Sequence, residues 1–384
     1  MDLLKKIFIF VLFLFPLGEI ARIDFGNGVA LKPLDIGVGV LVSSWLAFKL
    51  FNKQKIRQKN IYIPALLFSL SGFFSLTVGN LQLSLNEFLI SFLYLLRWLA
   101  YAGVFFVISD FDNDFKKKIS NTLIIVGSLV VGLGYLQYFF YSNLRNLYYL
   151  GWDEHMHRMF SVFLDPNFAG AFFVLFFLFL IGVFLKNKNI SAGILLMLTL
   201  GAVFLTFSRS ALIMLIISSS LLFVLMHKKI WIAILFGITI LVITMSSRYF
   251  SIENINLFRI VSSEARLATA KEAVRIILSR PIFGVGFNSY RYAKLDYGLR
   301  NNKLYLISHA DAGVDNSFLF VAATTGIVGF ILYLFLWFRI FKIASILAIA
   351  SIAGIFINSL FINSLFYPFI MLWLWIIIAI KVNR

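Results

Sequence analysis

Residues 168–185 read FAGAFFVLFFLFLIGVFL and contain no charged side chain. As an α-helix, a run of this length rises ~27 Å, close to the ~30 Å thickness of the hydrocarbon core of a bilayer. The apolar residues are continuous and do not alternate at every second position, which favours a helix over a strand of a membrane barrel. The stretch therefore predicts a membrane-spanning helix.

Similar stretches recur along the whole chain. Hydrophobic residues make up 61% of the sequence and charged residues 13%, and the mean hydropathy is +0.93, which excludes a soluble globular protein. We predict an all-α, polytopic integral membrane protein, a single membrane domain over residues 1–384, with about twelve transmembrane helices. The predicted spans are 4–21, 34–50, 61–79, 87–109, 119–140, 167–185, 190–206, 210–226, 230–246, 317–337, 343–361 and 365–380. The first span resembles a signal peptide, but residues 15–19 form a poor cleavage site, which indicates an uncleaved helix.

Lysine and arginine are distributed unequally between the two sides of these spans. The loops and termini on one side hold fifteen lysines and three arginines, and the remaining positions hold four lysines and twelve arginines. The positive-inside rule places the lysine-rich side, with both termini, in the cytoplasm. On the outer side, two segments are longer than connectors: residues 141–165, and an extracytoplasmic loop over residues 247–316 between the ninth and tenth spans.

The arginine-rich outer side indicates a phosphorylated, lipid-borne substrate, because the planar guanidinium group can bind two phosphate oxygens at once. Arg209 lies in a tight connection between two spans, beside a helix start capped by Ser208 or Ser210. A guanidinium group at a helix N-terminus is a competent phosphate site. The alternative is an interfacial arginine whose head reaches toward the membrane surface.

Arg97 lies in the middle of a predicted span. An arginine within the membrane usually faces the interior of a helix bundle or an aqueous cavity. Two interpretations stay open: a structural partner of Glu87 or of a backbone carbonyl, or an arginine at the floor of a substrate cavity.

The long outer loop contains a short amphipathic helix, over residues 265–279, in the sequence-based prediction. Arg266 lies in its first turn, and Leu267 and Val274 belong to an apolar stripe along one side. The helix is either a lid on the outer end of the helix bundle or an amphipathic helix at the membrane interface. The Gly284-Val-Gly286 turn that follows lacks the strand and helix of a dinucleotide site.

The segment before the tenth span carries side chains that can accept a proton. His309 and Asp315 are candidates for deprotonating a sugar hydroxyl, while Asp315 or Asn316 could instead cap the helix. His155 and His157, near Asp153, offer only a short metal-binding pattern, so we expect no metal site. Trp152 and the tyrosines near residues 138–149 are typical of an aromatic belt, with sugar stacking as the alternative.

Several segments together resemble the O-antigen ligase and polymerase superfamily of bacterial envelope proteins. Their order, their spacing and the long loop before the tenth span agree with that family over roughly residues 120–340. The matching pieces are Phe163-Leu-Asp165-Pro166-Asn167, Thr206-Phe-Ser208-Arg209, Arg266 followed by Arg280-Pro-Ile-Phe-Gly284-Val-Gly286, and Asp315-Asn316-Ser-Phe-Leu319 leading into Thr325-Gly326-Ile-Val-Gly329.

The resemblance implies a glycosyltransferase of the bacterial inner membrane that takes its glycan from an undecaprenyl pyrophosphate carrier on the outer side. It implies Arg209 and Arg266 as ligands of the diphosphate. Further substrate-binding candidates are Asn167 and Asn316, which belong to the matching pieces, and Arg97 within its span. The family ligases have His-Asn where this chain has Asp315-Asn316. The difference favours a polymerase over a ligase, with Asp315 or His309 as the base.

The expected partners are an undecaprenyl pyrophosphate-linked oligosaccharide, membrane lipid and a chain-length regulator protein. No cofactor is expected, because the donor is already activated. Nucleic acid is not expected either, since much of the net charge of +17 lies in short loops between spans. The rival function is a transporter or flippase for lipid-linked glycan, since about twelve spans is a common transporter count, although two matching halves are missing.

Overall fold

The computed structural model describes residues 1–26, 29–79, 81–249, 261–300 and 313–380 and is almost entirely helical. The only strands in this described part are β1 and β2, an antiparallel pair that brings Ile23 opposite Leu31. The elements are α1 (Asp2–Leu14), η1 (Phe15–Leu17), β1 (Ile23–Asp24), β2 (Ala30–Leu31), α2 (Pro33–Phe51), α3 (Lys59–Val78), α4 (Leu85–Asp110), α5 (Asn113–Phe140), η2 (Arg145–Leu150), η3 (Ser161–Phe163), α6 (Pro166–Asn187), α7 (Ile190–Leu205), α8 (Arg209–Leu225), α9 (Ile230–Tyr249), α10 (Val261–Ser279), α11 (Tyr290–Asp296), α12 (Ser317–Phe341), α13 (Ile346–Asn358), η5 (Ser364–Phe366) and α14 (Pro368–Ile380), where η denotes a 3-10 helix.

The predicted all-helical class is confirmed, and each predicted span coincides with a helix. Among the described residues, six helices are long and apolar enough to cross a membrane: α2, α3, α4, α5, α6 and α12. Shorter apolar helices make up α7, α8, α13, α14 and the first half of α9. Six spans are thus supported by length and composition, and the total of about twelve stays a prediction.

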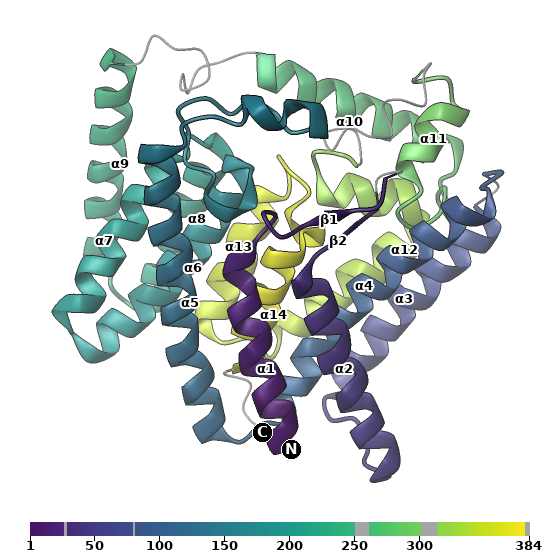
Figure 1. Ribbon diagram of the computed structural model, residues 1–384, viewed down its shortest axis with the longest axis horizontal. Coiled ribbons are helices and arrows are strands. Elements are labelled where there is room, and N and C mark those ends of the chain that lie inside the picture. The colour runs from purple at the N-terminus through teal and green to yellow at the C-terminus, as the bar shows by residue number, and fades with distance from the viewer. Residues whose placement is uncertain (27–28, 80, 250–260, 301–312, 381–384) are drawn as a thin grey trace.

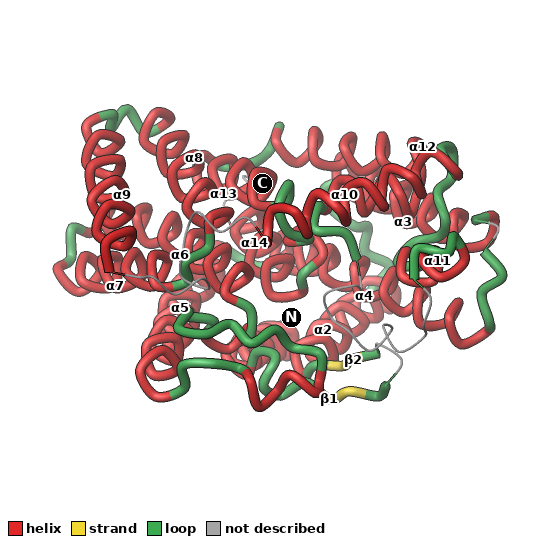
Figure 2. The backbone as a smooth tube through the Cα atoms, turned by 90° about the horizontal axis from the view of Figure 1, so that it is seen from above, coloured by secondary structure: helices red, strands yellow, loops and turns green. Residues whose placement is uncertain are grey.

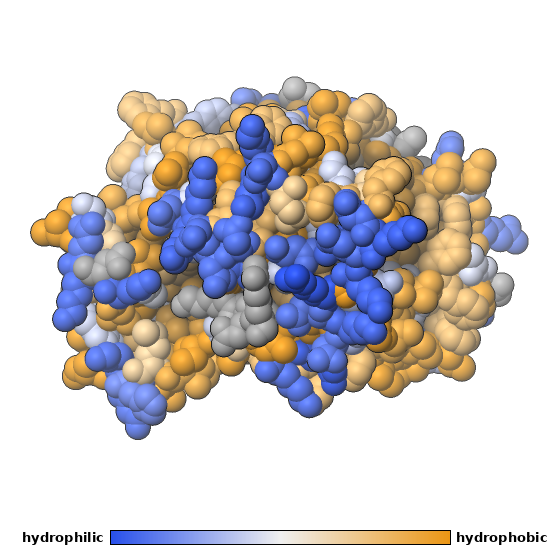
Figure 3. All heavy atoms as spheres, turned by 90° about the horizontal axis from the view of Figure 1, so that it is seen from below, coloured by the Kyte–Doolittle hydropathy of each residue, from blue (hydrophilic) through white to orange (hydrophobic). Residues whose placement is uncertain are grey.

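Ion pairs join the helix ends at the lower side of the molecule in Figure 1, where α1 begins. Lys5 pairs with Asp112 at the start of α5, and Lys49 Nζ lies 2.7 Å from a carboxylate oxygen of Asp110 at the end of α4. Figure 3 shows this face: hydrophilic side chains gather in its middle, and apolar side chains surround them. A polar end ringed by apolar sides fits a helix bundle embedded in lipid.

The centre of the bundle is formed by α14, which packs against α4, α6 and α13. Every residue of this helix from Pro368 to Ala379 is buried. A helix that is apolar on all sides needs apolar neighbours on all sides. Aromatic rings are among these neighbours: Trp373 packs edge-on against two rings of α6. Its ring centroid lies 5.0 Å from that of Phe172 and 5.7 Å from that of Phe176. The main core is therefore continuous from α1 to α14.

Across the opposite end of the bundle lies α10 (Figures 1 and 2). Its Ala273 and Ile276 are buried in a small second core, together with Tyr290 of α11 and Phe320 of α12. This packing fixes the helix that carries Arg266.

The connection between α10 and α11 inserts into a break in α12. The break is at Gly326, whose φ of 64° and ψ of −169° are not helical. The amide of Gly286 donates to the carbonyl of Thr324 (3.0 Å), and the amide of Ile327 donates to the carbonyl of Pro281 (2.8 Å). Backbone groups freed by a broken membrane helix must find such partners, because lipid offers none. The break therefore anchors the segment that follows α10.

Candidate active site

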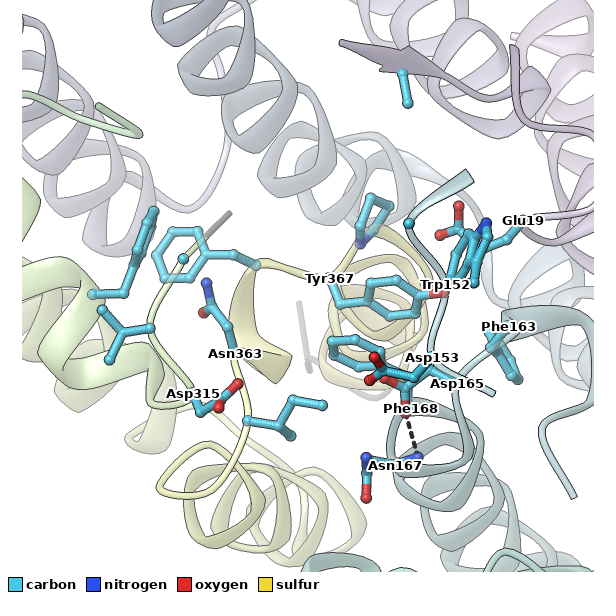
Figure 4. A pocket seen from close by; sticks show the side chains of 18 of the residues that line it. Glu19, Trp152, Asp153, Phe163, Asp165, Asn167, Phe168, Asp315, Asn363 and Tyr367 are labelled. Carbon is cyan, nitrogen blue, oxygen red and sulfur yellow. Dashed lines mark hydrogen bonds between the residues drawn. The ribbon is translucent and has the colours of Figure 1, made fainter. Parts of the chain in front are cut away.

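A cavity of about 880 Å³ lies where several segments from distant parts of the chain meet. Its wall combines α4, the 151–155 segment, the start of α6, the first turns of α10, the segment before α12 and the residues that precede α14. Figure 4 shows Asp315 on one side of this space and Glu19, Trp152 and Tyr367 on the other. Residues from nearly the whole length of the chain thus share one site.

Four of the predicted substrate or catalytic residues line the cavity: Arg97, Asn167, Arg266 and Asp315. Arg209 and Asn316 are not among the lining residues. His309 lies outside the residues that the structure describes.

Asp315 is partly buried in the segment just before α12. Burial raises the pKa of its carboxyl group above the ordinary value, because the charged form loses hydration. The positive charges of Arg266 and Lys294 lower this pKa, and the negative charges of Asp165 and Asp153 raise it further. A carboxylate with a raised pKa in a cavity is a candidate general base.

Arg209 is the first residue of α8, and its side chain is close enough to Arg266 for the two positive charges to act on each other. The turn before it is held in place: buried Arg158 donates from Nε to the carbonyl of Thr206 (2.8 Å), and Ser208 caps α8 through the amide of Ala211. Two guanidinium groups held near each other repel, so an anion between them would be stabilised by both.

Asn167 connects this turn to the cavity. Its Oδ1 accepts a hydrogen bond from Ser208 Oγ (3.0 Å), while its backbone amide donates to the capping carboxylate of Asp165 (2.6 Å). The Asp165-Pro166 helix start predicted from the sequence is confirmed. The N-termini of α6 and α8 are thus joined beside the cavity.

Comparison with known proteins matches residues 194–334 to the O-antigen ligase family, Wzy_C. No curated protein matches the chain. The match supports the predicted superfamily and, together with the apolar helices, a bacterial membrane enzyme of the ligase or polymerase type acting on a lipid-linked glycan.

Within the matched O-antigen ligase segment lie Arg209, Arg266, Asp315 and Asn316. Asn316 is the N-cap of α12: its Oδ1 accepts from the amides of Phe318 (2.9 Å) and Leu319 (3.0 Å). The structure thus supports the capping interpretation, and substrate binding by Asn316 stays a prediction.

Arg97 lies outside the matched segment. It has structural partners, as one of the two interpretations from the sequence predicts. Nη2 donates to the carbonyl of Ala30 (2.6 Å) and lies 2.9 Å from a carboxylate oxygen of Asp35. The acidic partner is Asp35 and not Glu87, which instead completes a capping box with Ser84 at the start of α4. Arg97 also borders the cavity, so both interpretations retain support.

Sequence reasoning missed three cavity residues that lie outside the matched segment: Glu19, Asn363 and Tyr367. Glu19 and Tyr367 carried no local signal, and the polar Ile-Asn-Ser repeat near Asn363 indicated only an interruption between the last two spans. The described residues contain no group of three metal-ligating side chains; His155 Nε2 lies 4.0 Å from a carboxylate oxygen of Asp153.

Proposed function

We propose that the protein transfers a glycan from undecaprenyl pyrophosphate to a sugar hydroxyl, at the outer face of the bacterial inner membrane. The observation that carries this proposal is that Arg266 and Asp315 border the same cavity and act on each other electrostatically. A guanidinium group that can hold a leaving diphosphate thus lies near a carboxylate that can accept a proton.

In the proposed reaction, the acceptor hydroxyl oxygen attacks the anomeric carbon of the donor glycan from the side opposite the diphosphate. The bond from this carbon to the diphosphate oxygen breaks, and undecaprenyl pyrophosphate leaves with the electron pair. The hydroxyl proton passes to Asp315. One displacement inverts the anomeric configuration, while Arg209 and Arg266 stabilise the charge that grows on the leaving group.

The repeated use of such a transfer on a growing glycan would make the protein a polymerase, and a single transfer would make it a ligase. We favour the polymerase because an aspartate stands at the position where the family ligases have histidine. A chain-length regulator is a further proposed partner. The arginine pair supplies the positive charge that other enzymes take from a metal ion, so the proposed reaction is metal-independent.

Changing Arg209 tests the diphosphate site. In proteoliposomes with lipid-linked oligosaccharide, Arg209→Ala is expected to lower product formation by ~10²–10³-fold, as loss of a preorganised donor does. Arg209→Lys should also have low activity if Arg209 binds two oxygens of the diphosphate at once. Arg275→Ala, an exposed position on α10, is the matched control and should keep full activity. Full activity of Arg209→Ala would contradict the assignment, and transport of labelled lipid without elongation would favour a flippase.

The pH dependence tests the role of Asp315. The proton acceptor must be ionised, so kcat/KM should rise with pH through a pKa above the ordinary aspartate value of ~3.9. Asp153 is exposed, and its negative charge raises the pKa of Asp315. In Asp153→Asn, the rise of kcat/KM should therefore occur at lower pH. Glu154→Gln, at the neighbouring cavity position, should leave the rise at the same pH as in wild type. A profile that falls at low pH in wild type and equally in Asp315→Asn would argue against Asp315 as the titrating group.

A further inference from the structure

Three polar atoms on the cavity wall are buried and have no hydrogen-bond partner among the described residues. They are Oε2 of Glu19, Oδ1 of Asn363 and the hydroxyl oxygen of Tyr367. Buried polar atoms are nearly always hydrogen-bonded in folded proteins, because leaving one without a partner is costly. Three such atoms around one cavity indicate that a ligand completes their hydrogen bonds.

The side chain and the backbone of Glu19 are both held in place by other residues. Its side chain is only 4% exposed. Oε1 lies 3.0 Å from Nζ of Lys32, and Oε2 lies 3.9 Å from Nη1 of Arg22, beyond hydrogen-bond distance, so Oε2 has no hydrogen bond in the described structure. Its amide donates to the carbonyl of Val162 (2.8 Å), which fixes the backbone of Glu19 against the segment before α6. The Tyr367 hydroxyl is close enough to interact electrostatically with Glu19, yet no hydrogen bond of normal geometry joins them.

Aromatic rings lie beside these atoms. The ring of Tyr367 stacks on Phe168 with centroids 3.9 Å apart and an interplanar angle of 13°, and Lys32 Nζ lies over the Tyr367 ring. Figure 4 places Trp152 near Tyr367 and Glu19. Flat apolar surfaces with a few convergent polar atoms are typical of small-molecule sites. Oε2 of Glu19 and Oδ1 of Asn363 can only accept hydrogen bonds, so the ligand must donate to these two atoms, whereas the Tyr367 hydroxyl can donate or accept.

We propose that this side of the cavity, defined by Glu19, Trp152, Asn363 and Tyr367, is a subsite for a neutral, hydroxyl-rich sugar ring of the lipid-linked glycan. This inference rests on the proposed function. Hydroxyl groups of the sugar donate hydrogen bonds to the side-chain oxygens of Glu19 and Asn363, and one more hydroxyl forms a hydrogen bond with the Tyr367 hydroxyl. The carbon face of the sugar ring packs on an aromatic side chain. A sugar carboxylate against Oε2 of Glu19 and Oδ1 of Asn363 is disfavoured, because acceptors would then face acceptors, and Lys32 and Arg22 already lie against Glu19.

The test uses the full-length protein in nanodiscs and two ligands: undecaprenyl pyrophosphate without sugar, and the lipid-linked glycan pool extracted from the cells that make the protein. Affinity is read from the rise of the unfolding midpoint with ligand concentration. Wild type should bind the glycosylated lipid more tightly than the sugar-free lipid. Tyr367→Phe should weaken the binding of the glycosylated lipid by roughly 2–10-fold, the effect of one hydrogen bond, and leave the sugar-free lipid unchanged. Asn363→Ala should act in the same direction.

Tyr333→Phe is the matched control. Tyr333 also has a buried hydroxyl without a hydrogen-bond partner in the described structure, but it does not line the cavity, so this variant should bind both lipids as wild type does. Equal binding of the glycosylated lipid by wild type and Tyr367→Phe would overturn the subsite. If neither lipid raises the unfolding midpoint of wild type, the proposed function itself fails. A lipid-linked pool rich in uronic acids should bind no better than the sugar-free lipid, and tighter binding would contradict the assignment to a neutral ring.

Discussion

Replacing Asp315 by asparagine is expected to lower glycan transfer by ~10²–10⁴-fold, the usual contribution of a general base. Asparagine keeps the shape of the side chain but cannot accept the proton. The assay is elongation of lipid-linked oligosaccharide in proteoliposomes, with substrate binding measured separately. Loss of turnover with retained binding is the expected pattern, because the carboxylate acts on the proton that moves during the reaction.

The same substitution is expected to leave thermal stability unchanged or higher at neutral pH. The folded pKa of Asp315 lies above its unfolded value, so the folded state binds more protons and its stability falls as pH rises between these two values. At neutral pH the ionised side chain therefore disfavours folding, and asparagine removes this cost. Active Asp315→Asn protein would contradict the role of Asp315, and inactive protein with a lowered unfolding midpoint would indicate a structural role instead.

Asp165→Asn separates the role of Asp315 from that of a second aspartate on the cavity wall. Asp165 caps α6, and asparagine caps helices about as well as aspartate. This variant should therefore fold normally and lose far less activity than Asp315→Asn. The reverse order of the two effects would assign the base to Asp165.

The helices could be predicted from the sequence because each apolar run is its own signal, and the helix starts at Asp165 and Ser208 carry local capping residues. The side that α10 buries could not be predicted from periodicity. Leu267 and Val274 of the expected apolar stripe are exposed, and Ala273 and Ile276 are buried instead. In a membrane chain, apolar residues face lipid as readily as protein, so the pattern alone does not choose the packed face.

Of the predicted residues that belong to the ordered motifs, Arg266 and Asp315 line the cavity and Arg209 does not. The Glu19 side of the cavity could not be predicted, because it forms only when α1 and α14 pack together with α6, far apart in the sequence. Burial of a polar atom without a partner is a property of the folded chain. No pattern around Tyr367 predicts it.

Gly284 and Gly326 affect the position of Arg266, because at both glycines the backbone is in direct contact with another segment. A Cβ on Gly284 would lie 2.5 Å from the carbonyl carbon of Thr324, and a Cβ on Gly326 would lie 2.2 Å from the carbonyl oxygen of Ile282. Ser75 Oγ of α3 donates to the Thr324 carbonyl (2.6 Å), so α3 closes the contact from a third side. The backbones of the α10–α11 connection and of α12 thus touch directly, and any side chain at these glycines would separate them.

Gly326→Ala is therefore expected to lower the free energy of unfolding by ~2–6 kcal/mol. The left-handed φ with extended ψ costs a non-glycine residue ~1–3 kcal/mol, and the overpacked contact adds ~1–3 kcal/mol. Because the displaced connection is joined to the end of α10, Arg266 should move out of the cavity, and transfer should fall even at temperatures where the variant stays folded. Gly132→Ala in α5 is the matched control, since a Cβ there meets nothing within 4 Å and alanine favours a helix by ~1 kcal/mol. Unfolding in detergent and transfer in proteoliposomes measure the two effects. If Gly326→Ala unfolds like Gly132→Ala, the break in α12 is not held by direct backbone contact, and the placement of Arg266 must depend on the buried side of α10 alone.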